Sequence, residues 1–60
     1  MILYYVKQFG LYYAGKDPDG TYVFTNTRVG TPAKNTRQAA EDLVKELGEE
    51  GCEIEERILG

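Results

Sequence analysis

The tyrosines of this chain occur in adjacent pairs, and this arrangement constrains the fold more than any other feature of the sequence. All five lie within the first 22 residues. Neighbouring residues of a β-strand point to opposite faces of the sheet, so we expect Tyr4 opposite Tyr5, and Tyr12 opposite Tyr13. A chain of 60 residues has material for only one helix, which covers one face. Aromatic rings are therefore predicted on a sheet face that no helix covers.

Turn-forming residues divide the first part of the chain into three short strands. Residues 2–8 are rich in β-branched and aromatic side chains, and the segment ends before Gly10, which can adopt the positive φ of a tight turn. Residues 11–16 then predict a second strand, and the Asp-Pro-Asp-Gly run at 17–20 favours a turn between strands. Residues 21–25 complete a three-stranded antiparallel meander.

The second half of the sequence predicts one helix and one further strand. A long loop over 26–35 leads to Thr36, the expected helix N-cap, with Asn35 as the alternative. Gly48 marks the expected end of the helix, and residues 52–59 alternate as a charged strand suited to a sheet edge. The apolar residues of the helix fall on one stripe: Ala39, Ala40, Leu43, Val44 and Leu47.

These elements predict a single small α+β domain over residues 1–60, with the order βββαβ. The helix is expected to pack on one face of the meander, and the short fourth strand joins whichever edge the helix crossing reaches. The sequence leaves open which edge that is.

Several classes of function are disfavoured by the composition. The chain has no histidine and one cysteine, Cys52, so the usual zinc sites, an internal disulfide and a histidine-activated nucleophile are not available. The carboxylate pairs at 49–50 and 55–56 are interpreted as solvated surface, because a core this small offers no deep pocket to shift their pKa values. We expect a protein that is not an enzyme and that binds no cofactor and no metal.

The apolar segments do not predict membrane association. The longest, residues 1–6, is far shorter than the ~20 residues that span a bilayer, and it lacks the features of a signal peptide. We therefore expect a cytoplasmic protein with no membrane partner.

Charge is unevenly distributed along the chain. Residues 1–40 contain five basic and two acidic residues, whereas residues 41–60 contain two basic and eight acidic residues. Such polarity can orient a charged partner, and it also favours solubility.

The aromatic sheet face is the candidate binding surface. Our first hypothesis is a non-enzymatic protein-interaction module that binds a protein partner or a second copy of itself, as a homodimer. The alternative is a nucleic-acid-binding module, in which bases stack on rings while cations neutralise phosphates. The candidate residues are Tyr5, Phe9, Tyr13, Tyr22, Lys7 and Lys16.

Two resemblances accompany these expectations. Segments 3–7, 10–13, 19–20, 22–25, 36–40 and 47–48 together resemble small phage and prophage proteins of unknown function, which are compact sheet-plus-helix proteins. This resemblance implies a fold and a possible action on a host factor. Part of the layout is also similar to the three-stranded arm-binding module of tyrosine recombinases, which inserts its sheet into a DNA groove and is usually basic on that sheet. In this chain Lys7 and Lys16 are the only cations of the meander before Arg28.

Overall fold

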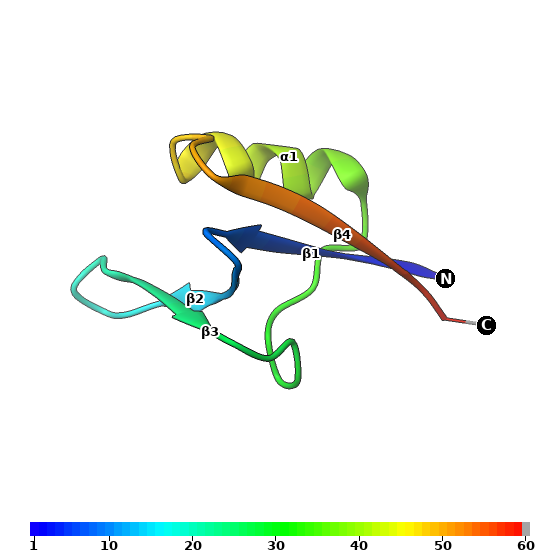
Figure 1. Cartoon of the computed structure of the whole chain (residues 1–60), viewed down its shortest axis with the longest axis horizontal. Coiled ribbons are helices and arrows are strands. Elements are labelled where there is room, and N and C mark those ends of the chain that lie inside the picture. Colours follow the sequence, from blue (N-terminus) through cyan, green and yellow to red (C-terminus); the bar gives the residue numbers. More distant parts are fainter. Residues whose placement is uncertain (60) are drawn as a thin grey trace.

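The computed structural model describes residues 1–59 as a four-stranded antiparallel sheet with one helix on one face (Figure 1). Gly60, the last residue of the expected domain, lies outside the described residues. The predicted α+β class and the order βββαβ are confirmed, although the third strand starts one residue later than expected and the fourth ends one residue earlier. The elements are β1 (Ile2–Gln8), β2 (Leu11–Lys16), β3 (Tyr22–Thr25), α1 (Arg37–Glu46) and β4 (Cys52–Ile58).

A two-residue turn joins β1 to β2. Phe9 has φ 51° and Gly10 has φ 82°. Two consecutive positive φ values are typical of a type I′ turn, whose twist matches that of the flanking strands. Glycine was expected in this conformation, but a phenylalanine there carries strain of about 1 kcal/mol. The Phe9 amide donates a 3.0 Å hydrogen bond to the carbonyl of Gly51, which fixes this turn beside the one that precedes β4.

The Asp-Pro-Asp-Gly run forms the predicted hairpin loop between β2 and β3. The Gly20 amide donates to the Asp17 carbonyl at 2.9 Å, and the Asp17 amide donates to the Thr21 carbonyl at 2.8 Å. A bulge between Tyr13 and Gly15 then shifts the register of the two strands. The hairpin extends away from the helix (Figure 1).

Specific hydrogen bonds define both ends of α1. The side-chain oxygen of Thr36 accepts from the Ala39 amide at 3.1 Å, so Thr36, and not Asn35, is the N-cap. At the other end, the Gly48 amide donates to the Lys45 carbonyl and the Glu49 amide donates to the Val44 carbonyl. This pair of bonds is the Schellman arrangement, in which glycine adopts the left-handed conformation; Gly48 has φ 89°.

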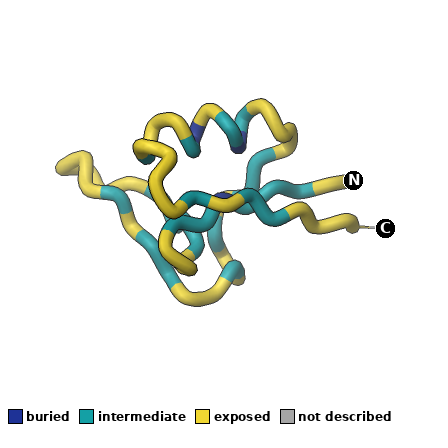
Figure 2. Tube along the Cα trace, turned by 45° about the horizontal axis from the view of Figure 1, so that its top comes forward, coloured by how far each residue is buried: buried dark blue, intermediate teal, exposed yellow. Residues whose placement is uncertain are grey.

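The core lies between α1 and the β1–β4 half of the sheet. Val6, Ala40 and Leu43 are buried. Figure 2 shows these buried positions on the underside of the helix and on the strand beneath it. The predicted stripe of the helix therefore faces the sheet. Partly buried side chains surround this centre: Tyr4, Tyr13, Val44, Leu47 and Ile54.

The last strand joins the sheet at β1. β4 pairs with β1 along its whole length, from Ile2 opposite Ile58 to Gln8 opposite Cys52. Beyond these pairs, Met1 and Leu59 exchange two further hydrogen bonds, at 2.8 and 3.1 Å. The edge that the sequence left open is therefore the β1 edge, and β4 itself becomes an edge strand.

The other side of β1 is shared between two segments. β2 pairs with β1 only at Lys7–Tyr12 and Gln8–Leu11. Nearer the start of β1, Tyr4 instead exchanges two hydrogen bonds with Lys34, at 2.8 and 2.9 Å. The loop before the helix thus enters the space where β2 diverges from β1.

Candidate interaction surface

The face of the sheet opposite α1 carries a compact group of aromatic and charged side chains, which we call the open face. Val6 and Ile54 pack towards the helix. Because side chains alternate along a strand, the odd-numbered residues of β1 and β4 point the other way. Tyr12 is paired with Lys7 and shares its face. The open face therefore comprises Leu3, Tyr5, Lys7, Tyr12, Glu53, Glu55 and Arg57.

An aromatic pair lies at the centre of the open face. The rings of Tyr5 and Tyr12 are 6.1 Å apart and nearly perpendicular, at 84°. The Lys7 ammonium lies 5.0 Å from the centre of the Tyr12 ring, within the range of a cation–π contact. Both tyrosines are half-buried. These contacts hold the two rings in a defined geometry, and part of each ring remains in contact with solvent.

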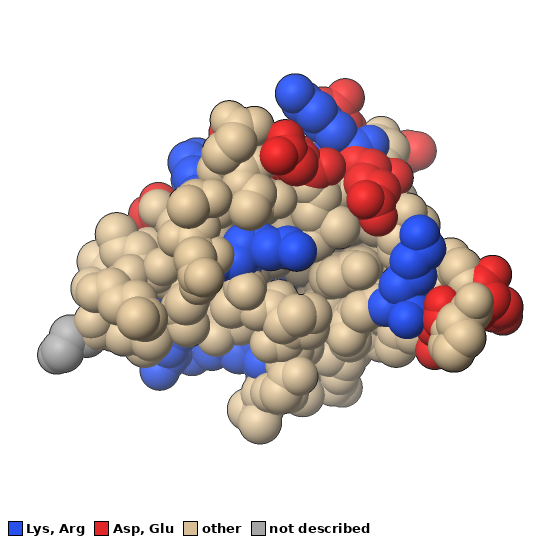
Figure 3. Space-filling model, turned by 180° about the vertical axis from the view of Figure 1, so that it is seen from behind, with Lys and Arg blue, Asp and Glu red and all other residues tan. Residues whose placement is uncertain are grey.

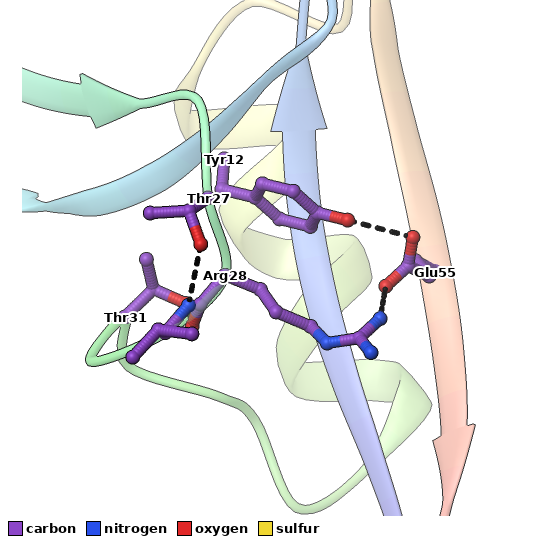
Figure 4. Close-up of polar contacts among 6 residues, drawn as sticks. Tyr12, Thr27, Arg28, Thr31 and Glu55 are labelled. Carbon is purple, nitrogen blue, oxygen red and sulfur yellow. Dashed lines mark hydrogen bonds and ion pairs between the residues drawn. The ribbon is translucent and has the colours of Figure 1, made fainter.

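Arg28 reaches this face from the loop that precedes the helix. Its guanidinium donates a 3.0 Å hydrogen bond to one carboxylate oxygen of Glu55, and the Tyr12 hydroxyl donates a 2.9 Å bond to the other. Figure 4 shows the Arg28 side chain crossing in front of β1, with the helix on the far side. No helix covers this face, as expected, but Arg28 covers some of it.

The polar contacts shift the pKa values of Glu55 and Arg28. The hydrogen bond from Tyr12, together with Arg28, lowers the pKa of the Glu55 carboxyl. The hydrogen bond to Glu55 raises the pKa of Arg28. Glu55 is therefore an ionised carboxylate whose charge is balanced within the chain.

The turn that carries Arg28 is held by its neighbouring threonines. The Val29 amide donates to the Thr27 hydroxyl at 3.3 Å, and the Thr31 hydroxyl donates to the Arg28 carbonyl at 2.7 Å. These bonds order a segment in which the sequence showed no periodicity. The run Thr27-Arg28-Val29-Gly30-Thr31 gave no signal of the partner of Arg28, since Glu55 lies 27 residues further on.

A second aromatic group lies on the helix side of the β2–β3 hairpin. Tyr13 packs against the core, and its ring lies 6.2 Å from that of Tyr22 and 6.0 Å from that of Phe24. The Tyr22 hydroxyl donates a 3.0 Å hydrogen bond to Glu46 at the end of α1, and this bond raises the pKa of Tyr22. The Lys16 ammonium lies 5.2 Å from the centre of the Tyr22 ring. These rings connect the hairpin to the helix.

The six candidate residues consequently occupy three places. Tyr5 and Lys7 lie on the open face, whereas Phe9 lies at the β1–β2 turn and is 69% exposed. The other three, Tyr13, Tyr22 and Lys16, lie on the helix side of the hairpin. The grouping of Tyr5 with Tyr13 and Tyr22 on one face is wrong, because the two-residue turn at 9–10 places Tyr12, and not Tyr13, beside Tyr5.

Charges on the open face are mixed in sign. Lys7, Arg28 and Arg57 are interspersed with Glu53 and Glu55. Seen from behind (Figure 3), acidic side chains gather over the helix and at the tip of the β2–β3 hairpin, and basic side chains lie on the surface between them. The basic and acidic halves of the sequence therefore do not form two separate faces.

Other kinds of site are not found in the part of the chain that the structure describes. Residues 1–59 form no pocket and bring together no group of three side chains with metal-binding character. No helix within this range is both long enough and apolar enough to cross a membrane. Burial raises the pKa of the Cys52 thiol, with a smaller contribution from Glu49, so the thiol is less readily ionised than a free cysteine.

No protein-family model, curated protein or solved structure matches this chain. The fold and the open face thus define its class as a small α+β protein with one helix-free sheet face. The resemblances to phage proteins and to the recombinase arm-binding module remain predictions.

Proposed function

We propose that this protein is a non-enzymatic protein-interaction module and that its open face binds a protein partner. The observation that carries the proposal is the Tyr5–Tyr12 pair, which lies half-buried on the face away from α1 with its rings 6.1 Å apart. Tyrosine suits such a surface, because the ring offers apolar area at low entropic cost and the hydroxyl tolerates water.

The contacts around the pair support binding without a large rearrangement. Tyr12 is held by Lys7 and Glu55, and Glu55 is held by Arg28. A surface whose side chains are already fixed loses less conformational entropy when a partner binds. The same contacts leave basic and acidic groups at the rim, where they can pair with the polar rim of another protein.

The charge pattern favours a protein over a nucleic acid. Phosphate binding requires a cluster of cations, and on this face the cations alternate with glutamates, one of which already binds Arg28. The two Lys–Tyr contacts, at Tyr12 and at Tyr22, lie on opposite faces of the sheet. A single strand of nucleic acid therefore has no common path over both.

Site-specific photo-crosslinking tests the proposal. p-Benzoylphenylalanine replaces Tyr5 in one variant and Gln38, on the exposed side of the helix, in a matched control. After irradiation in cells that express the protein, we expect the Tyr5 variant to give a discrete protein adduct and the control to give none. An added Tyr12→Ala substitution should abolish that adduct while circular dichroism shows a folded chain. Equal adducts from both positions, or none from Tyr5, would contradict the proposal.

The alternative function, nucleic-acid binding, is tested by measuring whether immobilised single-stranded DNA and RNA retain the protein at low salt. We expect no retention of the wild-type protein. Retention that is lost by about 200 mM salt and is weakened by Lys7→Ala would replace the protein partner by a nucleic acid.

A further inference from the structure

β4 is an edge strand whose outer side has almost no hydrogen-bond partners within residues 1–59. It contacts β1 on one side and α1 on one face. The reciprocal bonds between Met1 and Leu59, and the bond from Phe9 to Gly51, show that odd-numbered residues of β4 bond to β1. Because bonding alternates along an antiparallel pair, the even-numbered residues direct their N–H and C=O groups outwards. Within residues 1–59, the outward groups of Ile54, Glu56 and Ile58 have no hydrogen-bond partner.

We propose that two copies of this chain associate by antiparallel pairing of their β4 strands, with the two-fold axis at Glu55, to form a continuous eight-stranded sheet. This assembly goes beyond the proposed function, because it uses the strand edge and leaves Tyr5 and Tyr12 free. The other edge strand, β3, is only four residues long and contains no charged residue, whereas β4 is seven residues long.

The sequence of β4 is complementary to itself in this register. Glu55 is the midpoint of Cys52–Ile58, so centring the axis there overlaps the strands completely. Glu53 then lies opposite Arg57 of the second copy, and by symmetry this pair occurs twice. Both side chains are exposed and have no ion pair within the described chain. Opposite charges facing each other across two strands stabilise the pairing.

One pair of like charges meets at the axis, and the chain already balances it. Glu55 lies opposite Glu55 of the second copy. Each of these carboxylates accepts hydrogen bonds from Arg28 and Tyr12 of its own chain. Repulsion at the axis is therefore weakened at the only position where like charges face each other.

The apolar side chains of β4 also gain contacts in this register. Cys52 lies opposite Ile58 of the second copy, on the helix side of the sheet. Ile58 is 76% exposed in the single chain, because α1 does not extend over this end of the strand. Pairing covers it, and the outward backbone groups of Ile54 and Glu56 bond to each other across the axis.

A charge exchange tests the pairing by sedimentation equilibrium over micromolar to millimolar concentrations. We expect the wild-type protein to form dimers. Glu53→Arg and Arg57→Glu each place like charges opposite one another twice, and each should raise the dimer dissociation constant about tenfold. The double variant E53R/R57E restores opposite charges and should restore dimerisation. Thermal melts of each variant verify that the single chain remains folded.

Disulfide trapping tests the register. In the proposed dimer, Ile58→Cys places the new thiol opposite Cys52 of the second copy, about 5.5 Å away between Cα atoms, which suits a disulfide. We expect this variant to form a covalent dimer on mild oxidation. The wild-type protein should not, since its two Cys52 residues lie about 20 Å apart along the paired strands. A monomer at all concentrations, a dimer unaffected by the charge variants, or failure of I58C to cross-link would each overturn the proposal.

Discussion

The hydroxyl of Tyr12 on β2 donates a 2.9 Å hydrogen bond to Glu55 on β4, across the intervening strand β1. The two residues lie 43 positions apart in the sequence, at opposite ends of the chain. The bond joins the hairpin half of the sheet to its terminal half on the open face. It also orients the Glu55 carboxylate, which binds Arg28. The Glu55 side chain thus links β4 to β2 and to the loop before α1.

Removing this hydroxyl tests how much the link stabilises the fold. Tyr12→Phe is expected to lower the free energy of unfolding by about 1 kcal/mol, because the bond is lost and Glu55 retains only Arg28. Tyr5→Phe is the matched control, since the Tyr5 hydroxyl has no hydrogen-bond partner within residues 1–59, and its effect should be close to zero. Urea unfolding at neutral pH measures both. Equal effects of the two substitutions would contradict the assigned role of the Tyr12 hydroxyl.

Acid should weaken the fold partly through Glu55. The pKa of this carboxyl in the folded chain lies below its ordinary value of 4.5, first because Tyr12 donates to the ionised form and also because Arg28 does. Ionised Glu55 therefore stabilises the fold above the ordinary pKa, and this contribution is lost as the pH falls through the lower folded-state value. Urea unfolding between about pH 3 and 7 should show a shallower decline for Glu55→Gln than for the wild type.

Asp19 also makes the stability of the fold depend on pH in the acid range, so the effect of Glu55 has to be separated from that of Asp19. A hydrogen bond from the Thr21 amide lowers the pKa of the Asp19 carboxyl. Asp19→Asn serves as the control, and the effects of the two substitutions should add because the sites share no contact. A pH dependence that Glu55→Gln leaves unchanged would show that the carboxylate is not stabilised in the folded state.

Gly51 should tolerate substitution less well than Gly48, although both have positive φ, at 68° and 89°. A Cβ atom added at Gly51 would overlap the Phe9 ring. A Cβ atom added at Gly48 would have no surrounding atom within 4 Å. Gly48→Ala is expected to cost about 1 kcal/mol and Gly51→Ala about 2 kcal/mol of unfolding free energy. If the Phe9 ring causes the extra cost, Gly51→Ala should cost only about 1 kcal/mol when it is introduced into the Phe9→Ala variant. Urea unfolding of Phe9→Ala and of the double variant F9A/G51A measures this. If the cost is as large as in the wild type, the Phe9 ring is not what limits the space at Gly51.

Because the core is small, the stability of the fold should depend strongly on Leu43. Leu43 is 7% exposed and is one of only three buried side chains among residues 1–59. Leu43→Ala is expected to cost about 3 kcal/mol, which approaches the total stability of about 3 to 5 kcal/mol available to a domain of this size. Val44→Ala, on the same stripe but half-buried, should cost about 1 kcal/mol. Thermal melts followed by circular dichroism should show a largely unfolded chain only for the leucine variant.

Local chemistry made most of the elements predictable. Gly10 and the Asp-Pro-Asp-Gly run separate the strands, and Thr36 and Gly48 bound the helix, because each acts on its own neighbours in the chain. The edge that β4 joins was not predictable, since it depends on where a ten-residue helix returns the chain. Pairing over long separations decides that point, and local residue types do not encode it.

The candidate surface was predictable only in part. The rule of alternation correctly placed aromatic rings on both faces. The length of the turn at 9–10 also contained the signal for which tyrosine accompanies Tyr5, because a two-residue turn sets Gln8 opposite Leu11 and Lys7 opposite Tyr12. Arg28 gave no such signal. Its role depends on a loop conformation fixed by Thr27 and Thr31 and on a carboxylate contributed by a distant strand.

The entry of Lys34 beside Tyr4 has a consequence for how the molecule opens. Near its start, the backbone of β1 is bonded to β4 on one side and, at Tyr4, to Lys34 on the other, so the amide protons of Leu3, Tyr4 and Tyr5 should be among the slowest to exchange with solvent. The β2–β3 hairpin has just two residue pairs with β1, so its attachment to the rest of the fold depends largely on side chains: the Tyr12–Glu55 bond on the open face, and Tyr13 and the Tyr22–Glu46 bond on the helix side. Local opening of this fold should therefore begin at the hairpin once those side-chain contacts are lost, and Tyr12 would then separate from Tyr5 and Glu55.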